Sequence, residues 1–99
     1  MSMVNQFDIG QFVEVPTVSS ITTALVERMK KRRKEAKLSQ TALSKRSGVS
    51  FASIRRFEET GEISLSSLMR IADTLSCLED FNALFKHEII TDLKDYGND

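Results

Sequence analysis

The sequence predicts an all-α domain, and three observations carry that prediction. Apolar residues recur at helical spacing in several separate stretches of the chain. Ser39, Ser50 and Ser64 each precede such a stretch, and a serine hydroxyl can accept a hydrogen bond from a free amide in the first turn of a helix. Gly48 and Gly61 follow two of the stretches, where a chain leaving a helix often needs glycine. We expect a compact domain of five helices with an extended N-terminal arm.

The length and composition limit the class of protein. A chain of 99 residues allows one domain with a modest core. No apolar run approaches the roughly 18–20 residues of a membrane span, and the N-terminus lacks the pattern of a signal peptide. The single cysteine, Cys77, cannot form an internal disulfide, which fits a reducing compartment. We therefore expect a cytoplasmic protein that does not act at a membrane.

The formal net charge is zero, but the charges are segregated along the chain. Residues 21–60 contain eleven basic and four acidic residues, a net charge of +7, and the remainder contains three basic and ten acidic residues, a net charge of −7. One face can therefore attract a polyanion while the other end stays acidic. A near-neutral isoelectric point does not argue against DNA binding in such a chain.

Residues 1–20 do not show a helical pattern, and we assign them to the N-terminal arm. Residues 8–9 and 12–15 have the composition of two short strands, which would need a neighbour to pair with. Two alternatives remain open at this point. The segment is either a loose tail or an arm that packs on the domain or adds a strand to a second copy.

The first helix is expected from about Ser19 or Ser20 to Ala36, with Ile21, Leu25 and Met29 as its apolar stripe. Its second half contains the basic run Lys30–Lys34, which includes Arg32. Such a run is often only a solvated helix face. Because this one leads directly into the next two helices, phosphate contact is the favoured interpretation.

Two short helices are expected next, at about 39–47 and 50–58, joined by a tight turn at 47–49. Their apolar residues are expected to form the core, and these are Leu38, Ala42, Leu43, Val49, Ile54 and Phe57. A helix, a short glycine turn and a second helix follow the helix-turn-helix plan, whose second helix enters the major groove of DNA.

A fourth helix is expected from Leu65 to about Leu75 and a fifth from about Leu78 to Lys86. The inward stripe of the fourth is predicted as Leu65, Leu68, Met69, Ala72 and Leu75, with Ile71 beside it, and the fifth presents Leu78, Phe81, Leu84 and Phe85. We therefore divide the chain into an arm (1–20), a helix-turn-helix domain (21–86) and an acidic C-terminal tail (87–99).

The residues that could support catalysis are few. The only histidine, His87, lies near the C-terminus, away from any nucleophile or carboxylate cluster, and Cys77 is expected to be a half-buried structural residue. One cysteine and one histidine provide no metal-binding spacing, and there is no glycine-rich phosphate loop. We expect no enzyme activity, no catalytic residue, no metal and no cofactor.

Binding to DNA is better supported, by the third expected helix. Ala52, Arg55, Arg56 and Glu59 lie on one face at i, i+3, i+4 and i+7, opposite Ile54. Arginine can donate two hydrogen bonds to O6 and N7 of guanine. The alternative is that the two arginines only solvate the helix.

The beginnings of the two helices supply further candidates. The side chains of Ser50, Phe51 and Ser53 lie at the first turn of the third helix, where Phe51 could contact a thymine methyl. Ser39 and Gln40 open the second helix, and free amides with polar side chains beside them favour a phosphate oxygen.

The pattern of residues in this chain resembles that of a known family. The chain is similar to lambda-repressor-like helix-turn-helix domains of the Xre/Cro type over residues 25 to about 85. The resemblance rests on Arg33, Leu38-Ser39-Gln40, Leu43, Gly48-Val49-Ser50, Ile54, Phe57-Glu58 and Gly61. The chain departs from the family pattern at Lys37, where glycine is frequent, at Arg32, where an apolar residue is common, and at Ser44, where many relatives have alanine.

The resemblance implies a five-helix domain that binds an operator in double-stranded DNA as a homodimer. It also implies that Gln40 contacts the DNA backbone or a base and that Phe51, Ala52 and Arg56 face base edges. Arg33 and Glu58 would form a partly buried, structural salt bridge between the first and third helices. A nucleoid-associated location follows from this function.

A narrower resemblance is found in residues 56–65 and 80–85, which look like those of HipB-like antitoxins. That resemblance implies a repressor of its own operon that also binds a HipA-type toxin kinase. The leading hypothesis is therefore a sequence-specific regulator, most simply a repressor, reading a palindromic operator. The alternative is a protein-interaction module of the same fold that does not bind DNA.

Overall fold

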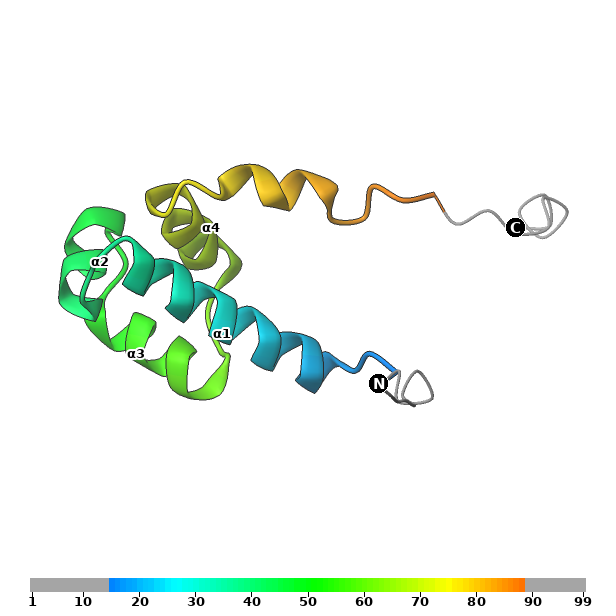
Figure 1. The fold of residues 1–99 in the computed structure, drawn as a ribbon, viewed down its shortest axis with the longest axis horizontal. Coiled ribbons are helices and arrows are strands. Elements are labelled where there is room, and N and C mark those ends of the chain that lie inside the picture. Colours follow the sequence, from blue (N-terminus) through cyan, green and yellow to red (C-terminus); the bar gives the residue numbers. More distant parts are fainter. Residues whose placement is uncertain (1–14, 89–99) are drawn as a thin grey trace, which may run out of the picture.

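In a computed structural model, the chain forms an all-α helix-turn-helix domain, and the structure describes residues 15–88 (Figure 1). Within these residues, four α-helices and one 3-10 helix follow in order. They are α1 (Val18–Glu35), α2 (Gln40–Ser47), α3 (Phe51–Thr60), α4 (Leu65–Thr74) and the 3-10 helix η2 (Leu78–Ala83). Helix α1 is the longest, and it lies between α3 on one side and α4 on the other in Figure 1.

The first helix begins slightly earlier than predicted. Thr17 is its N-cap, and the Thr17 hydroxyl accepts from the Ser20 amide while the Ser20 hydroxyl accepts from the Thr17 amide, both at 3.0 Å. This reciprocal pair is a capping box. The segment offers three neighbouring hydroxyl residues, so helical spacing alone could not identify which one caps the helix.

The predicted helix-turn-helix is confirmed. The hydroxyls of Ser39 and Ser50 cap α2 and α3 by accepting from amides three residues on. Gly48 ends α2 with a φ of 77°, in the left-handed region where a residue with a Cβ is strained. The short turn that follows lets α3 start at once and cross back over the core.

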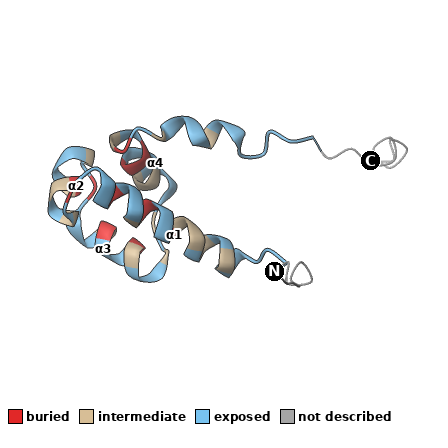
Figure 2. Cartoon of the chain, in the orientation of Figure 1, coloured by how far each residue is buried: buried red, intermediate tan, exposed pale blue. Residues whose placement is uncertain are grey.

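The core lies where α2, α3 and α4 meet α1 (Figure 2). Leu43, Ile54, Phe57 and Ile71 have no more than 1 % of their surface exposed. Other buried apolar residues around them are Val26, Met29, Leu38, Val49, Ala72 and Leu75. Burying side chains of this size contributes about 1.5–3 kcal/mol each to stability. Helix α3 therefore packs on a stable core.

The apolar stripes of α1 and α4 were only partly predicted. In α1, Val26 rather than Ile21 faces the core of the domain, and Ile21 is 54 % exposed. In α4, Ile71 is at the centre of the core, whereas Leu65 and Met69 are exposed. Both errors arise because each helix has more apolar residues than one buried face can use.

The fifth helix is shorter than expected, and it is a 3-10 helix. It ends at Ala83, and Leu84 has extended backbone. No side chain caps its start at Cys77, and Phe85 has a positive φ of 66°. A segment this short, without a cap, does not sustain α-helical hydrogen bonding.

The strand predicted at 8–9, residues 12–14 of the second predicted strand and most of the acidic C-terminal tail lie outside the described residues. Val15, the last residue of the second predicted strand, has no regular secondary structure. Within residues 15–88, the helices include none that is long and apolar enough to cross a membrane.

Candidate nucleic-acid interface

The outer face of α3 presents polar and charged side chains to solvent. Ala52, Arg55, Arg56 and Glu59 are exposed, while Ile54 on the opposite face is completely buried. Helical spacing and the firm core beneath α3 fix this orientation. The structure therefore brings the predicted base-reading residues onto one accessible surface, which we call the α3 face.

Both arginines of the α3 face are paired with carboxylates. Arg55 Nε donates to Glu59 Oε2 at 3.1 Å, and Arg56 Nη2 donates to Glu62 Oε1. The side chains of all four residues remain 60–65 % exposed. Sequence spacing could indicate the first pair, which is i, i+4, but not the second, because Glu62 lies beyond the end of α3.

The beginning of α3 carries the other predicted side chains. Phe51 is 43 % exposed, beside Ala52. The Ser50 hydroxyl accepts from the Ser53 amide and donates to the Ser53 hydroxyl at 2.8 Å. These two serines therefore form the N-terminal cap of α3. The other amides of the first helical turn have no partner within the helix and are available to a DNA phosphate.

Arg33 and Glu58 lie at the junction of three helices. Arg33 Nε donates to Glu58 Oε2 at 2.7 Å and Arg33 Nη2 to Glu58 Oε1 at 3.0 Å, a bidentate pair between α1 and α3. Arg33 Nη1 donates to the Leu38 carbonyl at 3.0 Å, and Gln40 Nε2 donates to Glu58 Oε1 at 2.8 Å. The pair is 10 % and 5 % exposed at its side chains, so charge and hydrogen bonds are satisfied together.

Gln40 is consequently held at the start of α2 by Glu58, half-buried and close to the Ser39 cap. The contact orients the side-chain amide of Gln40, and it places this residue next to α3. Residues of α2 and α3 that were predicted separately therefore meet at one junction.

Arg32 is not brought to the α3 face. Arg32 Nε donates to the Leu75 carbonyl at 3.1 Å, at the C-terminal end of α4. A guanidinium there satisfies a carbonyl that the helix itself leaves free, which explains why a basic residue can replace an apolar one at this position. Arg32 therefore contributes to the contact between α1 and α4, and its predicted contact with DNA stays a prediction.

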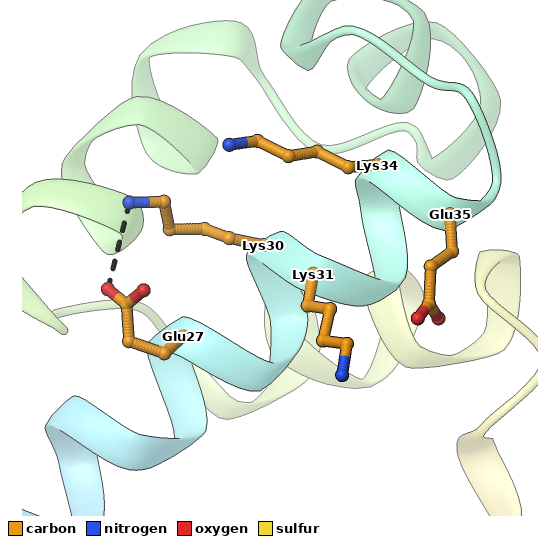
Figure 3. Close-up of a pocket in the computed structure, with 5 residues that line it drawn as sticks. All are labelled: Glu27, Lys30, Lys31, Lys34 and Glu35. Carbon is orange, nitrogen blue, oxygen red and sulfur yellow. Dashed lines mark ion pairs between the residues drawn. The ribbon is translucent and has the colours of Figure 1, made fainter.

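The remaining basic run forms part of the surface of α1. Figure 3 shows Lys30 and Lys34 extending from the same side of this helix, with Glu35 on the other side. The half-buried Lys30 forms an i, i+3 pair with the exposed Glu27, at 3.7 Å. Lys34 is the member of the run that lies one turn beyond Lys30 and closest in sequence to the helix-turn-helix.

An apolar groove that the sequence did not predict lies between α1, α4 and η2. It has a volume of about 580 Å³. Its apolar lining includes Leu25, Met29, Leu68, Leu75, Phe81 and Leu84. Leu84, which lines the groove, is 59 % exposed. Phe85, the next residue in the sequence, is 94 % exposed. We call this feature the α1–α4 groove.

Metal ligands do not cluster within the part of the chain that the structure describes. The described residues form a helix-turn-helix domain whose second helix has one face exposed to solvent. A family model for helix-turn-helix domains, HTH_3, matches residues 29–81, just over half of the chain. The chain belongs to this family of Xre/Cro-type helix-turn-helix domains, which are typical of DNA-binding transcriptional regulators. A comparison with curated proteins finds no match.

Proposed function

We propose that this protein is a sequence-specific transcriptional regulator, acting as a repressor, and that α3 reads its operator in the major groove. The single observation that carries the proposal is the α3 face. Arg55 and Arg56 project to solvent from a helix whose opposite side, Ile54 and Phe57, is fully buried. A rigid support of this kind lets side chains meet base edges at fixed positions.

The side chains of the α3 face suit particular base edges. A guanidinium donates to O6 and N7 of guanine, and each good bidentate contact contributes about 1–3 kcal/mol of discrimination. The methyl of Ala52 and the ring of Phe51 suit the methyl of thymine. We assign Ser39, Gln40, Ser50 and Ser53, at the starts of α2 and α3, to contacts with phosphates, which set the register of the protein on the duplex.

We further propose that the protein acts as a homodimer on a palindrome. The α1–α4 groove and the exposed Leu84 and Phe85 provide apolar surface of the kind that marks protein contacts. Arg28 and Lys31 on the α1 side of the groove and Asp80 on the η2 side would attract each other between two copies. The half-sites would then lie about 34 Å apart, one turn of DNA.

The antitoxin role is a finer proposal that rests on the HipB-like residues 56–65 and 80–85. In this role the protein would also bind a HipA-type toxin kinase in the cytoplasm. The test is binding of the purified protein to a purified HipA-type kinase from the same organism, by calorimetry. A kinase that does not bind would remove the antitoxin role and leave the regulator role untouched.

The regulator proposal is tested by selecting a site from randomised duplexes and then measuring affinity for the selected and for a random duplex across salt concentrations. If several phosphates are contacted, affinity should fall steeply with salt, with a slope of about −0.9 per phosphate in a log–log plot. A protein that binds neither duplex at low salt would instead support the alternative, an interaction module without DNA binding.

The role of Arg56 is tested in the same assay. Arg56→Ala should weaken binding to the selected duplex by roughly 10- to 100-fold, through the loss of a bidentate base contact, and should affect random DNA much less. Arg70→Ala is the matched control, because Arg70 is an exposed arginine on α4. An equal loss on both duplexes would remove Arg56 from base reading.

A further inference from the structure

The two arginines of the α3 face each have a carboxylate of their own. Glu59 lies one turn along α3 from Arg55, and Glu62 reaches back across the helix end to Arg56. The α3 face therefore carries two positive charges that are already compensated, within a region whose overall charge is strongly basic. This arrangement is unexpected on a surface that has to approach phosphates.

The pairs have little to do with the stability of the fold. Their side chains are 60–65 % exposed, and exposed ion pairs typically contribute little because water and salt screen them. The buried pair of Arg33 and Glu58 already joins α1 to α3. The exposed pairs therefore affect binding more than they affect folding.

The position of Glu62 is fixed by its backbone. The Glu62 amide donates to the Thr60 hydroxyl at 3.1 Å, and that hydroxyl donates to the Arg56 carbonyl at 2.7 Å. Gly61 between them takes a φ of 83° as the C-cap of α3. The turn that ends the recognition helix thus places a carboxylate beside one of its arginines.

We infer that Glu59 and Glu62 are specificity-determining residues, which hold Arg55 and Arg56 away from phosphates until a matching base edge replaces the carboxylate. This inference rests on the proposed function. On random DNA, an arginine released from its carboxylate gains only a screened phosphate contact. On the operator, it gains two directed hydrogen bonds to guanine, which compensate for the lost pair and for the approach of the carboxylate to the DNA.

The carboxylates therefore penalise random DNA more than the operator. Specificity is a difference between two affinities, and a repulsive element that acts mainly on the wrong partner increases it. Because any chromosome offers a very large excess of random sites, weaker binding to random DNA leaves more protein free for the operator.

The experiment compares Glu59→Gln, Glu62→Gln and the double variant with the wild type, on the selected duplex and on a random duplex at several salt concentrations. Glutamine keeps the size of the side chain and removes its charge. Glu79→Gln is the matched control for each single variant, since Glu79 is an exposed glutamate on η2 and its replacement makes the same change in net charge.

In the double variant, affinity for random DNA should rise roughly tenfold, and the salt slope on random DNA should steepen by up to about 2, as two more phosphates are contacted. Affinity for the selected duplex should change less, so the ratio of the two affinities falls. Glu79→Gln should leave that ratio unchanged.

Three results would overturn the inference. One is an equal gain on both duplexes, since that effect reflects net charge alone. Another is a gain no larger than that of Glu79→Gln. The third is a loss of affinity confined to the selected duplex, which would show that a glutamate itself accepts from cytosine. A wild-type protein that binds no duplex would remove the proposed function, an outcome distinct from all three.

Discussion

Two neighbouring glutamates of α3 show how position decides the role of one kind of ion pair. Glu58 is buried and accepts three hydrogen bonds, two from Arg33 and one from Gln40. Glu59, the next residue, is exposed and accepts from Arg55 one turn before it. Successive residues of a helix are rotated by about 100°. Glu58 therefore faces the interior and makes a structural contact, whereas Glu59 lies on a surface that remains available to a ligand.

The difference between the two pairs is physical. A buried carboxylate that loses its arginine, or an arginine that loses its carboxylate, remains uncompensated where water cannot replace the partner. An exposed partner is replaced by water and ions at little cost. The pair of Arg33 and Glu58 is therefore suited to fixing the angle between α1 and α3, and the pair of Arg55 and Glu59 is suited to exchange.

The largest effect is expected for Glu58→Ala, which leaves the buried guanidinium of Arg33 without its partner. We expect a loss of about 3–5 kcal/mol in the free energy of unfolding, measured by urea denaturation followed by circular dichroism. Glu59→Ala is the matched control and should stay within about 0.5 kcal/mol of the wild type. Equal losses in the two variants would show that burial does not separate the pairs.

A smaller effect is expected when both partners of the buried pair are replaced. Arg33→Met with Glu58→Leu should destabilise the protein less than Glu58→Leu alone, because no uncompensated charge remains. A double-mutant cycle by the same denaturation should give a coupling energy of about 1–3 kcal/mol. Additive losses would contradict a direct interaction between the two side chains.

The smallest effect is expected for the exposed pair of Arg56 and Glu62. A cycle of alanine variants should give a coupling energy of about 0.2–1 kcal/mol at low salt. In about 1 M salt, where the screening length is about 3 Å, this coupling should disappear, while that of Arg33 and Glu58 should persist. A salt-resistant coupling at Arg56 would mean that the pair contributes to the fold.

The helix-turn-helix was predictable because its signals are local. Ser39, Ser50 and Ser64 each cap a helix through the hydroxyl, as their position in the sequence indicated. Gly48 has the left-handed backbone that its place in the turn required. Lys37 also has a positive φ, of 61°, which explains why glycine is frequent at this position among the proteins that the sequence resembles.

What could not be predicted depends on contacts between distant segments. The bond from Arg32 to the Leu75 carbonyl joins residues 43 apart, so no local pattern could distinguish Arg32 from its basic neighbours. The α1–α4 groove needs two helices and η2 to be placed in space. The pairing of Arg56 with Glu62 depends on the turn at Gly61, which spacing along a helix does not describe.

The close approach of Gly61 to α1 has a consequence for how this chain can vary. A Cβ at Gly61 would overlap the methyl carbon of Thr22, so the two positions share one small volume. A larger residue at 61 requires the methyl at 22 to move aside or to be removed, as in serine, and the left-handed backbone still favours glycine. Positions 22 and 61 are thus expected to change together over evolutionary time, far apart in the sequence though they are.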